Sequence, residues 1–208
     1  MARVGDVLAA KRTVSFEFFP PKTSSAQMSM GKAVGELESL GPDFVSITYG
    51  AGGSDRHRTR DVVSWMQSET NLVPMAHLTC QGHTRTDVSA LLIEYRRDCV
   101  ENILSLGGDA PADGSPAKSD YTYALDLLDE VSDTGCFSVG VAAHPEVHPR
   151  SVSRESDRLH LAEKLRLADF AITQFFFDVE HYIRLVDEMA ALDVHKPIVP
   201  GIMPVTNL

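Results

Sequence analysis

The sequence is poor in cysteine and in positive charge, and each shortage excludes a class of protein. Its 208 residues include 3 cysteines. Three widely spaced cysteines without a CxxC pair favour free thiols and a cytoplasmic protein over a disulfide scaffold. The 19 Lys and Arg residues face 29 Asp and Glu, a net charge of −10. This charge repels phosphate backbones, so the sequence predicts no nucleic-acid partner.

Long apolar runs and linkers are missing as well. No apolar run approaches the ~18 residues that a membrane span requires, and the N-terminal residues lack the apolar core of a signal peptide. We therefore expect no membrane partner. No linker divides the chain, and 208 residues are close to the size of one domain, so we expect a single domain over residues 1–208. The sequence leaves the oligomeric state open.

Segments rich in apolar, β-branched and aromatic residues recur about every thirty residues. Their starts lie 30, 30, 29, 35, 33 and 27 residues apart. Most are apolar on both faces, which is typical of strands buried in a parallel sheet. The predicted strands are Thr13–Phe19, Asp43–Tyr49, Val73–Thr79, Asn102–Leu106, Phe137–Ala143, Phe170–Phe177 and Pro197–Met203.

The segments between these strands show helical periodicity. In one of them, apolar residues from Val88 to Tyr95 follow the i, i+3, i+4, i+7 spacing, and Thr86 is the predicted N-cap. Similar stripes predict helices around residues 30–37, 125–131, 161–165 and 182–189. A strand–helix unit repeated along the chain is typical of a β/α barrel or an open doubly wound sheet.

Polar residues recur where the predicted strands end. They are Glu17, Thr48, His77, Asp109, His144 and Gln174. Each one alone is also compatible with a turn residue or a satisfied polar group of the core. Active sites of barrels and parallel sheets form at the carboxyl ends of the strands, so their recurrence at that end predicts one pocket there.

Glu17 is the most informative of these residues. It lies between Phe16 and Phe18, and an apolar setting favours the neutral acid, which suits a general acid at neutral pH. The alternative is a salt bridge to Lys22 or Arg12.

Two further polar residues suit the binding of a flat ligand. Asp109 follows Gly107 and Gly108, and glycines allow a flat ligand to approach the backbone closely. Gln174 offers a donor and an acceptor together, as the edge of a heteroaromatic ring requires. The alternatives are an Asx-turn at Asp109 and a core amide at Gln174.

Three histidines raise the question of a metal. His144 and His148 lie in one short segment, with His77 as a possible third ligand. Pro145 and Pro149 argue against a helix that would hold both histidines on one face, and the segment is not H-E-x-x-H. We predict no metal site, and a metal-dependent hydrolase is kept as a competing hypothesis.

Seven ordered motifs carry a family resemblance. They are VSFEFFPPKT (14–23), FVSITYGAGGS (44–54), AHLTC (76–80), GGDAP (107–111), AAHPEVHP (142–149), AITQFFFD (171–178) and PGIMPVTN (200–207). From about residue 13 onward the chain strongly resembles the methylenetetrahydrofolate reductases. The resemblance implies a (β/α)8 TIM-type barrel. It also implies reduction of 5,10-methylenetetrahydrofolate to 5-methyltetrahydrofolate with electrons from NADH or NADPH.

The resemblance also assigns roles to individual residues. Glu17 would help to protonate N10 of the folate, and Asp109 would bind the pterin and face the reacting ring. Gln174 would contact the pterin, and Phe176 belongs to the aromatic run that would line the substrate slot. In the family FMN usually carries the hydride. The positions that correspond to its surroundings are Thr48, His77, Gly108, His144, Asp157 and Lys164.

The chain departs from the family pattern where the flavin would bind. Gly107 stands where arginine is common, His144 where tyrosine is common, His160 where asparagine is common and Glu163 where arginine is common. A carboxylate beside a phosphate is unfavourable, so we expect FMN to bind weakly or not at all and the hydride to pass directly from the nicotinamide.

Two other hypotheses are kept. In one, Lys164 and backbone N–H groups hold FMN and the reaction is a ping-pong exchange. In the other, the protein is a folate- or flavin-binding barrel without turnover.

Chain length adds one expectation. At about thirty residues per unit the chain provides about seven strand–helix units. The resemblance implies eight strands, so we expect the C-terminal unit of the barrel to be missing from this sequence. Either the sequence is truncated or the barrel is open at one seam.

Overall fold

Seven parallel strands form a single sheet in the described part of the chain. The computed structural model describes residues 2–49, 56–108 and 119–204. The strands follow one another in the order β1 to β7, so each pairs with its neighbours in sequence. Their bounds are β1 Ser15–Phe18, β2 Phe44–Ile47, β3 Pro74–Thr79, β4 Asn102–Leu106, β5 Ser138–Ala143, β6 Phe170–Thr173 and β7 Ile198–Val199. The prediction of seven strands of a TIM-type barrel is confirmed.

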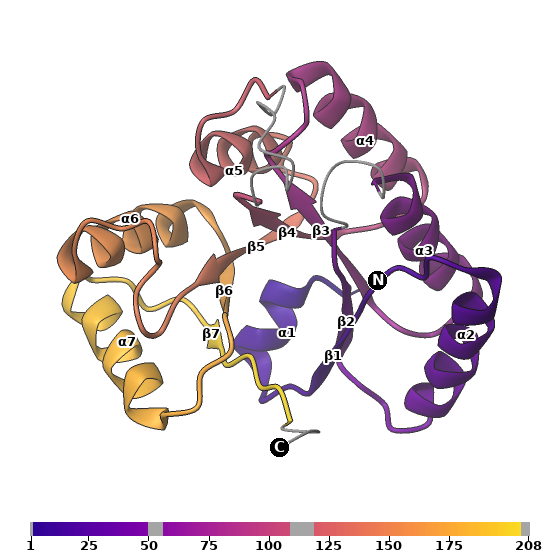
Figure 1. The fold of residues 1–208 in the computed structure, drawn as a ribbon, viewed down its shortest axis with the longest axis horizontal. Coiled ribbons are helices and arrows are strands. Elements are labelled where there is room, and N and C mark those ends of the chain that lie inside the picture. Colours follow the sequence, from indigo (N-terminus) through magenta and orange to yellow (C-terminus); the bar gives the residue numbers. More distant parts are fainter. Residues whose placement is uncertain (1, 50–55, 109–118, 205–208) are drawn as a thin grey trace.

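Helices connect the strands and cover the outer side of the curved sheet (Figure 1). They are α2 Ser24–Glu38, α3 Arg56–Glu69, α4 Arg85–Arg97, α5 Ala124–Asp133, α6 Arg154–Leu167 and α7 Val179–Ala191. The five predicted stripes lie on α2, α4, α5, α6 and α7. None of the helices in the described segments is long and apolar enough to cross a membrane.

The predicted N-cap of α4 was wrong by two residues. Thr84 caps the helix by accepting a hydrogen bond from the Asp87 backbone N–H, and the Asp87 carboxylate accepts one from the Thr84 N–H. This reciprocal arrangement is a capping box, and it satisfies two donors at the helix start. Thr86 lies inside the first turn instead.

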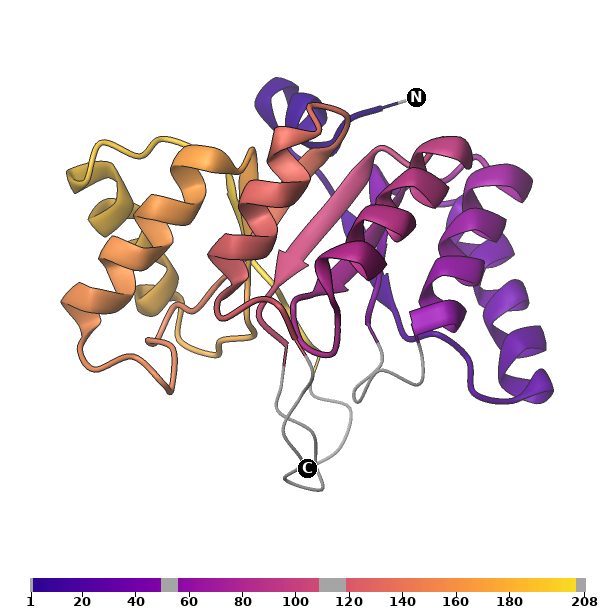
Figure 2. The same ribbon diagram turned by 90° about the horizontal axis from the view of Figure 1, so that it is seen from above.

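A short helix that sequence periodicity did not predict covers the amino-terminal end of the sheet. This helix, α1, spans Val4–Ala10 and lies across one end of the sheet (Figure 2). The Val4 N–H donates to Asn102 Oδ1 at 2.8 Å, and the Gly5 N–H donates to Ser138 Oγ at 2.9 Å. Asn102 and Ser138 begin β4 and β5, so polar side chains at two strand starts bind the helix in place.

An apolar cluster fills the inside of the curved sheet. It consists of Val4, Phe44, Met75, Leu104 and Phe170, all buried. Leu104 and Phe170 both pair in register with Gly140, so the three residues share one face of the sheet. A larger cluster lies between the sheet and the helices. The inner cluster fills the part of the interior toward the amino-terminal ends of the strands. Polar groups are therefore accommodated at the carboxyl ends of the strands.

The last two strands are shorter than predicted. β6 ends at Thr173 rather than at residue 177, and β7 has two residues. Beyond β7, the Gly201 N–H donates to Thr173 Oγ1 at 2.9 Å, and a Cβ on Gly201 would lie 2.3 Å from the Thr173 carbonyl oxygen. The chain therefore crosses the end of β6 at a distance that only glycine permits.

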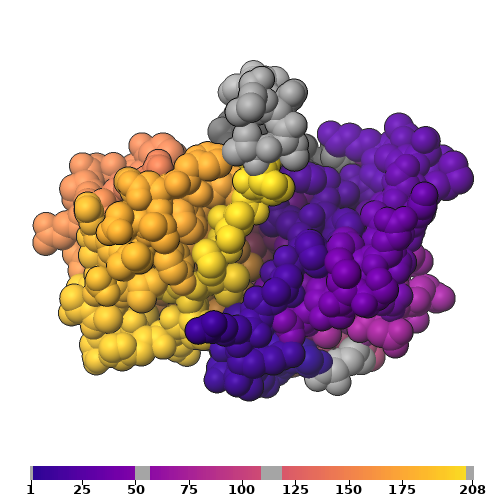
Figure 3. Space-filling view, turned by 90° about the horizontal axis from the view of Figure 1, so that it is seen from below, coloured from indigo at the N-terminus to yellow at the C-terminus, as the bar shows by residue number. Residues whose placement is uncertain are grey.

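The two edges of the sheet, β1 and β7, do not pair with each other in the described residues. Figure 3 shows this side of the molecule, with the yellow C-terminal segment next to the indigo N-terminal segment.

The close fit between Gly140 and Phe170 yields a stability prediction. A Cβ on Gly140 would lie 2.4 Å from Phe170 Cε2 and 2.9 Å from Leu104 Cδ1. We expect Gly140→Ala to lower the free energy of unfolding by about 2 kcal/mol because the interior becomes overpacked. Gly35→Ala on α2 is the control, because nothing lies within 4 Å of its added methyl group. Chemical unfolding of both variants provides the measurement, and equal midpoints would contradict the assigned fit.

Candidate active site

The polar residues predicted from the sequence lie at one edge of the sheet. Glu17 and His77 are part of β1 and β3, while Thr48, His144 and Gln174 each directly follow a strand. Because the strands are parallel, these positions form the carboxyl edge from β1 to β6. Asp109, the predicted pterin ligand, lies outside the described residues, and Gly108 is the last described residue before it.

Glu17 lies close to side chains from the next two strands of the sheet, β2 and β3. Its Oε2 accepts a hydrogen bond from Ser46 Oγ at 3.4 Å and lies 3.5 Å from His77 Nε2. Glu17 and Ser46 are register partners in β1 and β2, so both side chains point to the same face. Within the described residues Glu17 makes no ion pair with Lys22 or Arg12, the alternative considered from the sequence.

Burial changes the acidity of both groups. Desolvation raises the pKa of Glu17, and the hydrogen bond from Ser46 opposes this rise in part. Desolvation lowers the pKa of His77 to about 4, so its imidazole is neutral at neutral pH. The pair is therefore a carboxyl group beside an uncharged imidazole, and not an ion pair. A carboxyl group that keeps its proton at higher pH is suited to act as a general acid.

Thr48 and Gly108 shape the backbone at the ends of β2 and β4. The Thr48 N–H donates to the Phe18 carbonyl at 2.9 Å, and its own carbonyl accepts from the hydroxyl of the buried Thr59. Gly108 has a φ of 76°, a conformation that favours glycine. A Cβ at Gly108 would lie 3.0 Å from Thr79 Cβ, so the end of β4 passes close to the end of β3.

Gln174 and Phe176 follow β6 and differ in their surroundings. Gln174 is exposed, its N–H donates to the Ala143 carbonyl at 2.8 Å, and its Oε1 accepts from the Phe175 N–H. The Phe176 ring stacks on the Tyr182 ring of α7, with centroids 5.6 Å apart and planes inclined by 6°. Phe176 thus packs at the start of α7, whereas the exposed Gln174 is accessible to a ligand.

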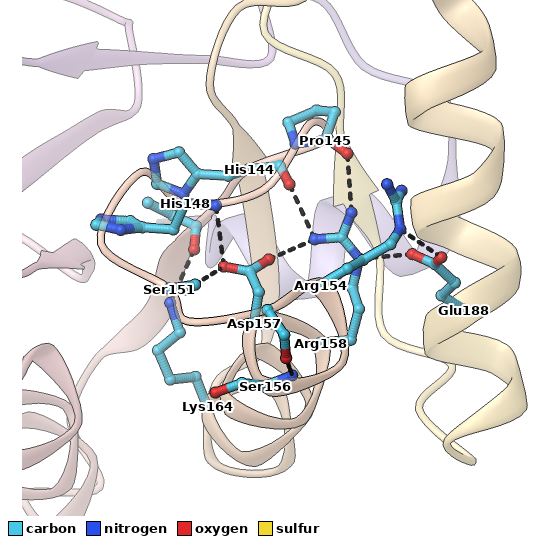
Figure 4. A network of polar contacts seen from close by, with 12 residues as sticks. His144, Pro145, His148, Ser151, Arg154, Ser156, Asp157, Arg158, Lys164 and Glu188 are labelled. Carbon is cyan, nitrogen blue, oxygen red and sulfur yellow. Dashed lines mark hydrogen bonds and ion pairs between the residues drawn. The ribbon is translucent and has the colours of Figure 1, made fainter.

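A network of buried charges joins the loop after β5 to α6 and α7 (Figure 4). Its centre is Arg158, which is 4% exposed. The guanidinium donates to the carbonyls of His144 at 3.0 Å and Pro145 at 2.8 Å, and to Glu188 Oε2 at 2.6 Å. It also pairs with the Asp157 carboxylate. Arg158 therefore holds the shape of the loop that carries His144.

Asp157 and Glu188 are fully engaged by this network. Asp157 Oδ1 accepts from the His148 N–H at 3.1 Å and from Ser151 Oγ at 2.9 Å. Burial raises the pKa of Glu188, but hydrogen bonds from Arg154 and Arg158 outweigh burial and hold the pKa below its usual value.

The roles of Arg158 and Ser46 were not anticipated from the sequence. A signal for Arg158 exists: it lies three residues before Leu161, at a spacing that shares one helix face. Ser46 carries no such signal, because a serine between Val45 and Ile47 has the pattern of any buried strand residue.

The histidines of the β5–α6 loop contact each other. The rings of His144 and His148 meet edge to face, with centroids 4.5 Å apart. Desolvation, together with the nearby His148 and Lys164, lowers the pKa of His144 to about 4. Within residues 2–49, 56–108 and 119–204, no three His, Cys, Asp or Glu side chains are grouped closely enough to hold a metal ion.

The buried network leads to a second prediction. Arg158→Met removes the cation that pairs with Asp157, whose side chain is 9% exposed. We expect the free energy of unfolding to fall by about 3 kcal/mol, because a buried carboxylate loses its partner. Arg96→Met on the exposed face of α4 is the control and should change stability by less than about 0.5 kcal/mol. Similar unfolding midpoints for the two variants would show that the network adds nothing to stability.

Sequence comparison connects this site to known proteins. A model of the family described as methylenetetrahydrofolate reductase matches residues 3–208. The 5,10-methylenetetrahydrofolate reductases of Pectobacterium carotovorum subsp. carotovorum and Salmonella typhimurium are each 41% identical to the chain, over 201 and 196 residues. The alignments cover 96% and 93% of this chain but 66% and 65% of the relatives. The chain thus spans just under two thirds of their length.

A solved structure supports the fold at much lower identity. An uncharacterized protein from Clostridium thermocellum, which binds two copies of 5-methyl-5,6,7,8-tetrahydrofolic acid, has a TM-score of 0.66 and 14% identity. The alignment covers 95% of this chain and 68% of that one. At this identity the likeness shows the fold alone. The family match, by contrast, covers nearly the whole chain, and the chain belongs to the methylenetetrahydrofolate reductase family.

Proposed function

We propose that this chain catalyses the reduction of 5,10-methylenetetrahydrofolate to 5-methyltetrahydrofolate, with NADH or NADPH as the electron donor. The observation that carries the proposal is the half-buried Glu17 at the carboxyl end of β1, whose pKa burial raises. Family membership supports the substrate class. The choice between NADH and NADPH is left open.

The reaction requires one proton and one hydride. Glu17 donates the proton to N10 of the folate, and the bond between N10 and the methylene carbon breaks. The carbon is then part of an iminium ion with N5, and hydride from the nicotinamide converts it to a methyl group while the nicotinamide is oxidised. Asp109, Gln174 and Phe176 are the proposed folate contacts. Thr48, His77, Gly108 and His144 are proposed to surround the nicotinamide.

We further propose that the hydride passes directly from the nicotinamide, without a flavin. In this chain, the residues at the positions that bind the flavin phosphate in the family pattern are not suited to bind a phosphate. The Asp157 carboxylate is occupied by Arg158, Ser151 and the His148 N–H. The Lys164 ammonium donates to the Ala142 carbonyl at 3.0 Å.

Charge at the remaining positions also disfavours a phosphate. Burial lowers the pKa of Lys164, and the nearby Asp157 opposes this only in part. His160 and Glu163 are 73% and 56% exposed and lie 3.8 Å from each other on the outside of α6. A flavin phosphate near Lys164 would therefore meet cations that already have partners, and no further cation is offered by His160 or Glu163 on the outside of the helix.

A cytoplasmic location is part of the proposal. Cys80, Cys99 and Cys136 are free, which supports the proposal that the protein works in the reducing cytoplasm.

Replacement of the proposed acid tests the function. We expect Glu17→Gln to lower turnover with methylenetetrahydrofolate by at least about 100-fold, because an amide cannot supply the proton. NADH binding, measured by fluorescence titration, should be preserved. Glu36→Gln on the exposed surface of α2 is the control and should leave both values unchanged. Normal turnover by the Glu17 variant would exclude Glu17 as the acid. Absence of turnover in the unchanged protein, with or without added flavin, would favour a non-catalytic binding protein.

The absorbance spectrum tests the proposed absence of flavin. We expect the purified chain to show no flavin band near 450 nm and to oxidise NADH with methylenetetrahydrofolate without added FMN. A stoichiometric flavin band, or turnover only after FMN addition, would favour the ping-pong reaction. Turnover that strong chelators abolish would instead support a metal-dependent enzyme.

A further inference from the structure

One carboxylate oxygen of Glu17 lies near two polar groups, a serine hydroxyl and a histidine ring nitrogen. Ser46 Oγ lies 3.4 Å from Oε2, and His77 Nε2 lies 3.5 Å from the same atom. The serine comes from β2 and the histidine from β3. Catalytic hydrogen bonds are often long before the substrate binds and shorten in the complex, so both contacts are close enough to act on the proton of Glu17.

His77 has a buried nitrogen that lacks a hydrogen-bond partner. Its side chain is 8% exposed, and no hydrogen bond of good geometry reaches Nε2 within the described residues. A buried polar atom without a partner destabilises a fold, and such an atom in a native structure calls for a functional explanation. Glu17 Oε2, an oxygen of the proposed acid, lies 3.5 Å from this nitrogen.

The two neighbours suit the two protonation states of Glu17. A neutral carboxyl group is a donor, and a neutral imidazole nitrogen accepts its proton. A carboxylate is an acceptor, and the serine hydroxyl donates to it. We propose that Ser46 and His77 are positioning residues for Glu17. His77 Nε2 accepts the O–H of the acid before proton transfer, and Ser46 Oγ–H stabilises the carboxylate afterwards.

The proton balance follows from this arrangement. During the reaction the Oε2–H bond of Glu17 breaks and a bond from the proton to N10 forms, so Glu17 becomes a carboxylate. The Glu17 side chain is 42% exposed, so water can return a proton to it after each turnover. His77 stays neutral throughout, because burial keeps its pKa near 4. Its role is therefore to hold the acid and not to carry charge.

Few other groups act on Glu17. Burial raises its pKa, the hydrogen bond from the Ser46 hydroxyl opposes this rise, and no charged side chain in the described residues contributes. The residues that face it are its register partner Ser46 from β2 and His77 from β3, the next strand but one. Removing one of these two groups should thus change the pKa of Glu17 without a competing change in charge.

The decisive experiment is a carbon-13 NMR titration of the Glu17 carboxyl group in the full chain without substrate. In Ser46→Ala the carboxylate loses its donor, so the pKa of Glu17 should rise by about one pH unit. In His77→Leu the protonated acid loses its acceptor, so the pKa should fall by a similar amount. Opposite shifts are the expected result, and loss of packing alone would not produce them.

Two further variants serve as controls for the loss of packing. His77→Gln keeps an acceptor close to the position of Nε2 and should restore most of the pKa that His77→Leu loses. Ser105→Ala removes another buried strand hydroxyl, whose register partners Leu78 and Val141 pack under the helices, and should leave the pKa of Glu17 unchanged. If His77→Leu fails to fold, His77→Gln carries the test, and the expected result is then a smaller shift to lower pKa.

The catalytic role inferred for Ser46 and His77 rests on the proposed reaction. The possible outcomes distinguish a failure of this inference from a failure of the proposed reaction. A rise of the Glu17 pKa in His77→Leu would show that Nε2 donates to the carboxylate. An unchanged Glu17 pKa in both variants would show that Ser46 and His77 only pack against it. Each result overturns the proposal. If turnover is present, the alkaline limb of the pH–rate profile should move to higher pH in Ser46→Ala and to lower pH in His77→Leu. Opposite NMR shifts without turnover would retain the pairing and reject the reaction.

Discussion

Burial of a small apolar cluster inside the curved sheet is the constraint on which the rest of the structure depends. Val4, Phe44, Met75, Leu104 and Phe170 exclude water from the lower interior, and Gly140 leaves the space that the Phe170 ring occupies. Side chains inside a small barrel are stacked in layers, so polar residues are accommodated only above this cluster. Glu17 and His77 lie at that level, where burial changes both pKa values while Glu17 stays accessible to a substrate.

The buried charges of the β5–α6 region show how stability and binding compete for the same groups. A guanidinium that is taken out of water must have its donors satisfied, and Arg158 achieves this with two loop carbonyls and two carboxylates. The same contacts remove Asp157 from the groups available to a ligand. In a chain with a net charge of −10, the proposed anionic substrates would need other cations and backbone N–H groups at the mouth of the barrel.

Much of the fold and part of the site were predictable from the sequence. The thirty-residue recurrence located all seven strands. The aromatic neighbours of Glu17 predicted a buried acid, but its side chain is 42% exposed, because Glu17 lies on the edge strand β1 at the open end of the sheet. Helix α1 was missed because seven residues with one buried side chain form no apolar stripe. The ends of β6 and β7 were overestimated because aromatic and apolar residues beyond Thr173 pack outside the strands, as Phe176 does on Tyr182. Arg158 was missed because charged residues on helices ordinarily face water.

The sequence by itself determined the family resemblance, the repeated strand–helix order and the identity of the residue proposed as the acid, because residue type and spacing carry this information directly. Only the tertiary structure decided which groups meet. Ser46 and Glu17 are 29 residues apart, and Arg158 and Glu188 are 30 apart. Their contacts depend on strand register and helix orientation, which the free energy of the whole packed chain determines and a local pattern does not. For the same physical reason, Asp157 became part of an internal network of hydrogen bonds, and the Glu17 carboxylate came within 3.5 Å of Ser46 and His77.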